Sequence, residues 1–208
     1  VQDQQGKRFE AILNSFDRNS LLFTPQKPVA IPPASSLRIE ILQALPKQKA
    51  LDFILQKTTE LGVSRLDVFC GMHSPKTFSN SEKQHHIKRW QRIVSEASKQ
   101  CGRQFAPEIH FHPDISAALE KLPECLNSWM LTSEEADAVS WKQISGDKDD
   151  IIKHHRVLIG PEGGFHQDEI KLSLRSGMRQ VYLGPRILRS ETATISAVSI
   201  LQFLWGDL

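Results

Sequence analysis

The sequence predicts an α/β protein built on a parallel sheet flanked by helices, and two observations support this prediction. From residue 37 onward, short apolar segments alternate with longer segments in which apolar residues recur every three or four positions. Such repeated strand-then-helix units are typical of parallel sheets covered by helices. Residues 157–159 are wholly apolar, as expected for a strand that is buried on both faces.

The expected elements are assigned from the period of the apolar residues. Strands are expected at 9–16, 20–24, 37–42, 65–70, 109–112, 129–132, 157–159 and 180–183. Helices are expected at 47–61, 81–101, 115–122, 167–175 and 191–205. Residues 133–155 are polar and predict a loop that contains a weak helix.

Two of these helices have a clear apolar face. On the first it is formed by Leu51, Ile54, Leu55, Thr58 and Leu61, and Gly62 ends the helix. On the second it is formed by Ile87, Trp90, Val94, Ala97 and Cys101.

The first 36 residues are expected to form a separate unit. Residues 25–36 contain four prolines and predict a stiff connector. The two strands before it are too few to form a core. They therefore belong to a small β module whose first half is absent here, or they pack on the main body, residues 37–208. The chain opens at Val1 rather than Met, and we expect its natural N-terminus to be trimmed or unordered.

Composition excludes several classes of protein. Hydrophobic residues make up 39% and charged residues 24%, which excludes disordered and fibrous chains. No apolar run reaches the roughly 20 residues of a membrane helix. The sequence shows no basic-then-apolar leader, so secretion is not expected. Three cysteines without CxxC spacing favour reduced thiols in the cytoplasm. The histidines lack zinc-site spacing, so no metal is expected.

A glycine-rich turn, IGPEGGF (159–165), follows the wholly apolar strand and precedes a helix. In a parallel sheet, ligands bind outside the carboxyl ends of the strands, where this turn must lie. Glycines allow a ligand to approach the backbone, and Gly163 and Gly164 are expected to face it. The turn matches neither GxGxxG nor a Walker motif, so phosphate binding has little support. The alternative is a tight turn with no ligand.

A second strand enters a comparable turn, LGPRILRSETA (183–193). Ser190 is expected to cap the next helix, and Glu191 suits the positive helix start. Two arginines among apolar residues indicate that the segment folds over something. The small residues of the following helix allow packing inside the chain or against a second subunit; the alternative is an ordinary amphipathic helix.

Basic residues project from the long helix opposite its apolar face: Lys88, Arg92, Lys99 and Arg103. A basic stripe on a chain with a net charge of only +2 suits a polyanion such as nucleic acid. The alternative is a solvated helix face.

Four segments, in their order along the chain, resemble the ribosomal RNA small-subunit methyltransferase E family. They are LDFILQKTTELGV (51–63), RWQRIVSEASKQCGRQFAPEI (89–109) and the two glycine turns. This family belongs to the knotted SPOUT methyltransferases, and the resemblance spans about residues 40–205. It implies a parallel sheet with a C-terminal deep trefoil knot. Residues 1–36 resemble the second half of the family's N-terminal PUA-like RNA-binding module.

The resemblance also implies an activity. Members transfer a methyl group from S-adenosyl-L-methionine to N3 of a uridine in the 16S ribosomal RNA of the small subunit, uridine 1498 in the usual numbering. They act as cytoplasmic homodimers.

Several positions depart from the family pattern. Ala50 and His73 replace basic residues, Lys49 adds a basic residue, and Ser190 replaces a threonine. His166 replaces a serine and is expected to weaken a helix N-cap. The departures affect the RNA side more than the cofactor side.

The expected cofactor pocket is formed by three loops at strand ends. Its residues are Leu131, Thr132, Gly160, Pro161, Glu162, Gly163, Gly164, Leu183, Gly184, Ile187 and Leu188. The expected RNA-binding residues are Lys88, Arg92, Lys99, Arg103 and Arg186.

The expected catalytic residues are Arg189, Arg103 and Glu191. Arg189 adjoins the cofactor turn, and Arg103 matches an arginine of the family motif. N3 of uridine must lose a proton before it attacks, and Glu162 or Glu191 is the candidate base. Two alternatives remain: a noncatalytic RNA-binding protein that retains the fold, and a nucleotide-dependent transferase that uses the GPEGG turn for phosphate.

Overall fold

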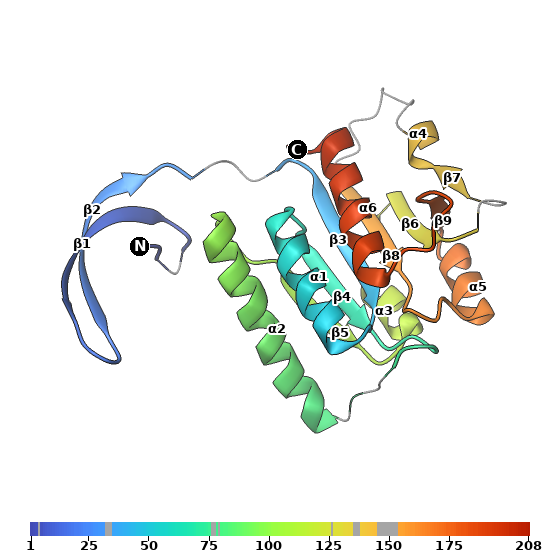
Figure 1. Ribbon diagram of the computed structural model, residues 1–208, viewed down its shortest axis with the longest axis horizontal. Helices are drawn as coiled ribbons and strands as arrows, with labels where there is room; N and C mark the ends of the chain where they lie inside the picture. Colours follow the sequence, from blue (N-terminus) through green and yellow to red (C-terminus); the bar gives the residue numbers. More distant parts are fainter. Residues whose placement is uncertain are drawn as a thin grey trace.

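A sheet of seven strands organises the computed structural model of the protein (Figure 1). The structure describes residues 1–3, 5–31, 35–75, 78, 80–125, 127–134, 138–144 and 154–208. The strands are β3 (Arg38–Ala44), β4 (Arg65–Phe69), β5 (Glu108–His112), β6 (Asn127–Thr132), β7 (Val139–Ser140), β8 (His154–Ile159) and β9 (Arg179–Tyr182). Their order is β5-β4-β3-β8-β6-β9-β7, and every pair is parallel. The expected parallel α/β class is confirmed.

Helices cover both faces of this sheet (Figure 1). One face packs against α1 (Gln48–Glu60), α2 (Asn80–Cys101) and α6 (Ser190–Trp205). The other packs against α3 (Ile115–Lys121) and α5 (Gln167–Arg175), and the short α4 (Trp141–Ile144) follows β7. Side chains of a strand alternate between faces, so Ile39 and Ile41 join the first core cluster while Leu42 and Ala44 join the second.

The predicted strands and helices of the sheet domain agree with the structure to within a few residues, with one exception. The short strand β7 was not predicted, because residues 133–155 were expected to be a loop with a weak helix; α4 is the helix found there. The apolar face of α1 is buried as expected, and Gly62 ends it with a φ of +88°. The expected stripe of α2 is wrong at its end, because Cys101 is exposed while Ser98 is buried.

The N-terminal hairpin pairs β1 (Arg8–Phe16) with β2 (Leu21–Val29) and stands apart from the sheet (Figure 1). The predicted strand at 20–24 was too short: β2 runs through Pro25 and Pro28, in the segment expected to be a connector. Proline is tolerated there because β2 has a neighbour on one side only.

Most of the hairpin surface is exposed. Its exposed apolar side chains are Ile12, Leu13, Phe16, Leu21, Leu22, Phe23 and Val29. Two hydrogen bonds connect this N-terminal region to the loop after α2: Arg8 Nη2 donates to the carbonyl of Arg103 at 3.1 Å, and Gln2 Nε2 to that of Gln104 at 2.9 Å.

A buried ion cluster ties β3 to β8. Arg156 donates to Glu40 Oε2 at 3.1 and 2.7 Å, and Arg38 lies 2.7 Å from Oε1. His154 Nε2 lies 3.1 Å from Oε1, at ion-pair distance but without hydrogen-bond geometry. Burial acts to raise the pKa of Glu40, yet the hydrogen bonds and charge of Arg156, with His154 and Arg38, hold that pKa below its ordinary value. Burial lowers the pKa of His154.

The cluster predicts a loss of stability in acid. Both folded-state pKa values lie below the ordinary values of 6.5 for His154 and 4.5 for Glu40. The unfolded chain therefore binds more protons, and the stability present at neutral pH declines below about pH 6.5 and again below about pH 4.5.

Replacing Glu40→Gln tests this cluster. Because it leaves Arg156 buried without its carboxylate, we expect the free energy of unfolding at pH 7 to fall by about 3–5 kcal/mol in urea denaturation. The acid decline below about pH 4.5 should also become shallower. Glu108→Gln is the control, since Glu108 is 69% exposed and 3.9 Å from Arg65. An equal effect of the two substitutions would contradict the assignment.

Candidate functional site

The loops that follow β6, β8 and β9 enclose a pocket of about 410 Å³ at the carboxyl edge of the sheet. This volume lies within the range of about 300–1,000 Å³ that small-molecule sites occupy. All the residues expected to hold a cofactor lie in its wall: Leu131, Thr132, Gly160, Pro161, Glu162, Gly163, Gly164, Leu183, Gly184, Ile187 and Leu188. We call it the three-loop pocket.

The wall of the three-loop pocket combines apolar side chains, uncharged polar side chains and loop backbone, and it carries few charges. Met130, Ile159 and Phe165 contribute apolar surface. The charged residues among its described lining are Glu134, Glu162 and Arg186. A ligand with a flat, neutral ring and a few polar atoms suits such a wall, because backbone N–H and C=O groups can bind its edge.

Two glycines leave the pocket open to a ligand. Gly164 has a φ of +74° and Gly184 a φ of +121°, and a Cβ at either position would meet no atom within 4 Å. Gly163 lines the pocket as expected, and a Cβ there would also lie 3.0 Å from the Cβ of His73. Its lack of a side chain makes room for the neighbouring loop.

The loop after β4 holds the glycine turn from outside. His73 Nδ1 lies 3.2 Å from the carbonyl oxygen of Gly164. The buried carboxylate of Glu169 accepts from the backbone N–H of Met72 at 3.0 Å and of His166 at 2.8 Å. One side chain of α5 therefore joins two loops.

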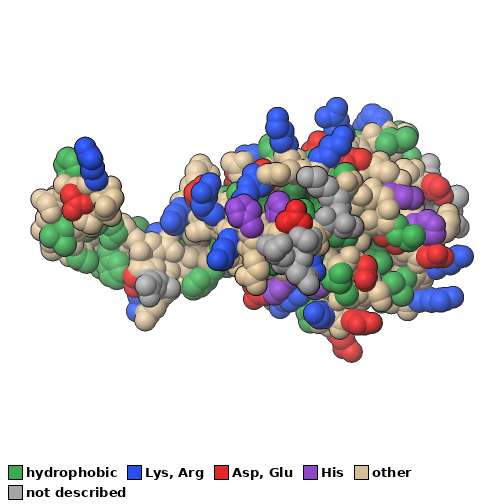
Figure 2. All heavy atoms as spheres, turned by 90° about the horizontal axis from the view of Figure 1, so that it is seen from below, with side chains coloured by type: hydrophobic (Ala, Val, Ile, Leu, Met, Phe, Trp, Pro, Cys, Tyr) green, Lys and Arg blue, Asp and Glu red, His purple; other side chains and the backbone are tan. Residues whose placement is uncertain are grey.

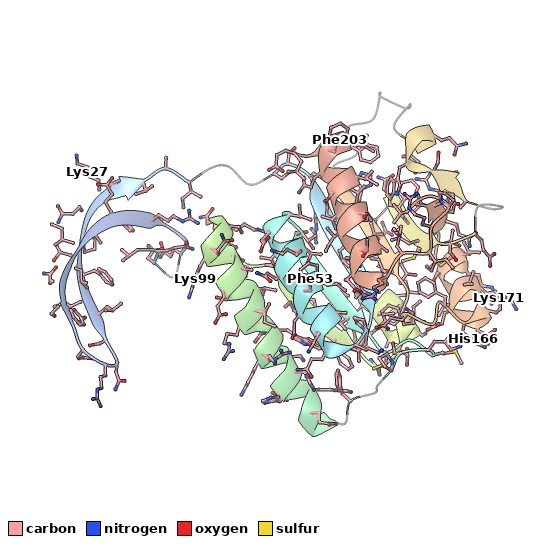
Figure 3. All side chains as sticks on the ribbon, viewed as in Figure 1. Lys27, Phe53, Lys99, His166, Lys171 and Phe203 are labelled. Atoms are coloured by element: carbon pink, nitrogen blue, oxygen red, sulfur yellow. The ribbon has the colours of Figure 1, made fainter. Side chains whose placement is uncertain are left out.

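His166 caps α5, contrary to the expectation that it weakens the cap. Its Nδ1 accepts from the backbone N–H of Asp168 at 3.2 Å, and Glu169 completes a capping box. An imidazole nitrogen accepts a hydrogen bond here as a serine oxygen would. Figure 3 shows His166 at the start of α5.

Gln43 is a residue of the site that the sequence analysis missed. It is fully buried in β3, and its Nε2 donates to Ser190 Oγ at 2.9 Å. Thr194 Oγ1 donates to Gln43 Oε1 at 2.8 Å, and Ser190 Oγ donates to the carbonyl of Gly160 at 3.0 Å. A glutamine inside an apolar strand was the available signal, since a buried polar side chain needs partners.

This network corrects the role expected of Ser190. Arg189 occupies the N-cap position of α6 and makes no side-chain capping bond, while Ser190 is the first helical residue. The hydroxyl of Ser190 instead joins α6 to the turn after β8.

The residues expected to act on a substrate lie at different places. Arg186 lines the three-loop pocket, and both Arg186 and Arg189 are exposed. Glu162 lines the pocket, and its Oε1 accepts from the backbone N–H of Lys47 at 3.3 Å. Glu191 is half-buried in the first turn of α6, next to the pocket residue Ser190.

Arg103 is not brought to the pocket within this chain. Its Nη1 donates to the carbonyls of Thr59 at 2.9 Å and Val63 at 2.7 Å, at the end of α1. Burial lowers the pKa of its guanidinium. The 13 residues of α1 separate this end from the carboxyl edge of the sheet by roughly 20 Å.

The other basic residues of the expected RNA stripe lie along α2. Lys88, Arg92 and Lys99 are exposed, and Arg92 Nε lies 3.6 Å from Glu96. Figure 3 shows Lys99 at the end of α2 nearest the hairpin, far from His166.

Within the described residues, no three His, Cys, Asp or Glu side chains group in a way that could hold a metal ion. The helices in that part of the chain are all too short or too polar to cross a membrane.

Known proteins are similar to this chain in sequence and in fold. Two Buchnera aphidicola proteins named ribosomal RNA small subunit methyltransferase E are similar: the one from subspecies Acyrthosiphon pisum is 31% identical over 83% of this chain and 66% of its own length. The one from Schizaphis graminum is 33% identical over 84% and 68%. The chain thus spans about two thirds of the length of these relatives.

Two solved structures have a similar fold, and each similarity covers 100% of this chain and 83% of the solved chain. A protein from Legionella pneumophila in complex with bound SAM has a TM-score of 0.88 at 27% identity. A ribosomal RNA small subunit methyltransferase E from Neisseria gonorrhoeae bound to S-adenosyl methionine has a TM-score of 0.83 at 29% identity.

The profile of the RNA methyltransferase domain family matches residues 33–202, most of the chain. Together with the identity to the Buchnera proteins, this match decides the family. The chain belongs to the RNA methyltransferase domain family and, within it, to the ribosomal RNA small subunit methyltransferase E group.

Proposed function

We propose that this chain is an enzyme that transfers a methyl group from S-adenosyl-L-methionine to N3 of a uridine in the 16S ribosomal RNA of the small subunit, uridine 1498 in the family. The observation that carries the proposal is the three-loop pocket, whose wall contains every residue expected to hold the cofactor. Relatives of the same fold have been solved with this cofactor bound. The complete pocket favours an enzyme over a noncatalytic RNA-binding protein.

The pocket fits the cofactor on its own chemistry. An adenine needs apolar faces and backbone partners at its edge, and Leu183, Ile187 and Leu188 with the loop backbone offer both. The open space at Gly164 and Gly184 allows close approach. No lysine occurs among the described residues of the wall, which disfavours a nucleotide-dependent transferase.

The bound cofactor supplies an electrophilic methyl group on a sulfonium; the chain supplies position and charge. Holding the two reactants in line accounts for much of the rate of such a transfer. The chain must also remove the N3 proton, and Glu162 or Glu191 serves as the base. Arg189 stabilises the negative charge left on the ring or holds an RNA phosphate.

Replacing Gly164→Ala tests the cofactor assignment. The substitution adds a methyl group to a residue of the pocket wall and strains a positive φ, so we expect S-adenosylmethionine affinity to fall at least tenfold in calorimetry and methyl transfer to 16S rRNA to fall with it. Gly177→Ala is the matched control, because Gly177 has a φ of +87° and open space but lies outside the pocket. It should cost comparable stability and leave cofactor affinity unchanged. Equal affinities in the two folded variants would refute the placement.

The RNA surface is proposed to include the exposed basic residues of α2 and Arg186 on the pocket rim. Reversing Arg92→Glu and Lys99→Glu should weaken RNA binding and reduce the log–log salt slope by about 0.7–0.9 for each lost phosphate contact. Lys171→Glu is the control, since Lys171 lies on α5 at the far side of the molecule (Figure 3). If RNA affinity and the salt slope are unchanged in filter binding, the basic residues of α2 form only a solvated helix face.

Arg103 is proposed to hold the end of α1 in its own chain and not to contact the substrate bound to that chain. Its bonds to the end of α1 give it a structural role there, and a contact with the target nucleotide would have to come from another subunit.

We also propose that the protein is a cytoplasmic homodimer with a knotted C-terminal region and that residues 1–36 belong to a PUA-like RNA-binding module. Strand β9 lies between β6 and β7 although it follows both in the chain, which favours a threaded connection. Phe203 is 76% exposed on the apolar helix α6, which favours a subunit contact there (Figure 3). A single-chain mass in sedimentation at micromolar concentration would count against the dimer.

A further inference from the structure

A second cavity, of about 240 Å³, opens at the same edge of the sheet as the three-loop pocket. We call it the aromatic pocket. Its walls come from the end of β3, the start of α1, the loop after β4 and the first half of α2. The two pockets share no lining residue, but the backbone N–H of Lys47, in the wall of the aromatic pocket, donates to Glu162 of the three-loop pocket.

Three aromatic rings give this cavity its character. Phe78 and His86 stack with centroids 4.1 Å apart, and Trp90 lies 6.2 Å from Phe78 and 6.0 Å from His86. Leu45 and Leu51 complete an apolar wall. A cavity of about 150 Å³ is enough to bind benzene, so a single flat ring of nucleobase size fits this one. Faces of aromatic side chains are the usual platform for an unstacked base of single-stranded RNA.

Basic side chains stand at and beside the mouth of the aromatic pocket. Lys47 lines the pocket, Lys49 lies two residues further along, and both are exposed; the first turn of α1 contains no acidic residue. Figure 2, which views the molecule from the edge where α1 and α2 begin, shows Lys, Arg and His side chains gathered there. A phosphate backbone passing this mouth would be attracted to it.

We propose that the aromatic pocket binds an unstacked base of the RNA substrate, and that this base belongs to a nucleotide near the target rather than to the target itself. The inference rests on the proposed function, and the separation of the two cavities decides between the two bases. The target base must enter the three-loop pocket to reach the methyl group. A base in the aromatic pocket, on the other side of the Lys47–Glu162 hydrogen bond, instead anchors the strand next to the target.

Two substitutions test the pocket in the full chain. Phe78→Ala removes part of the stacking surface, and Gln48→Trp fills the mouth from an exposed position of α1. We expect each to raise the KM for 16S rRNA and the Kd for a fluorescent uridylate hexamer by about 5- to 150-fold, the loss of one base–aromatic stack. The kcat and the S-adenosylmethionine affinity should stay within twofold of the unmodified chain.

Matched controls remove the same groups elsewhere. Phe105→Ala changes a phenylalanine that is 61% exposed, and Gln91→Trp changes an exposed glutamine of α2; neither residue lines the aromatic pocket. If Phe78→Ala fails to fold by circular dichroism, Gln48→Trp decides the matter, because its site is on the surface.

The outcomes separate this inference from the proposed function. Unchanged KM and hexamer affinity in a chain that methylates RNA would overturn the aromatic pocket and leave the enzyme in place. A drop in kcat with KM unchanged would assign the pocket to the target base and overturn the anchoring role. A chain that does not methylate RNA but binds the hexamer through Phe78 and Gln48 would support the pocket and reject the reaction.

Discussion

The hydrogen bonds of Gln43 fix the relation between the parts that form the three-loop pocket. The pocket needs the turn after β8 and the start of α6 at a fixed distance, and these segments are 30 residues apart at Gly160 and Ser190. The buried amide of Gln43 in the adjacent strand β3 binds the hydroxyls of Ser190 and Thr194 in α6, and the hydroxyl of Ser190 in turn donates to the carbonyl of Gly160. Leaving any of these groups unpaired costs about 1–3 kcal/mol. The backbone atoms of the pocket are therefore held by the interior of the protein.

A second set of contacts holds the glycine turn from its outer side. Glu169 binds two backbone N–H groups from different loops, and His73 lies against Gly163 and Gly164. The turn is clamped between α5 and the loop after β4, so its glycines serve two purposes. Gly163 admits the neighbouring loop, and Gly164 leaves space on the pocket side. A preformed wall of this kind loses little conformational entropy when a ligand binds.

Local pattern was enough to predict six of the seven strands and the loops of the site, but not β7, whose two residues are too few to show a period. A strand with apolar residues on both faces reads as a continuous apolar run, and the loops at the carboxyl ends of adjacent parallel strands must meet. Features that depend on distant partners were missed. The carbonyls that bind Arg103 lie 40 and 44 residues away, and Gln43 binds residues 147 and 151 positions later. The length of β2 was missed because proline is compatible with a strand that pairs on one side.

The departures from the family pattern acquire a physical meaning from this arrangement. Ala50, His73 and His166 all lie along the carboxyl edge of the sheet, yet none lines the three-loop pocket. The ring centroids of His73 and His166 lie 5.9 Å apart. His73 contacts the backbone carbonyl of Gly164 in the glycine turn, and His166 accepts a hydrogen bond from the backbone of α5. Lys49 is exposed in the first turn of α1, next to Gln48, which lines the aromatic pocket. The changes therefore leave the lining of the three-loop pocket intact and fall along the edge of the sheet at which both pockets open.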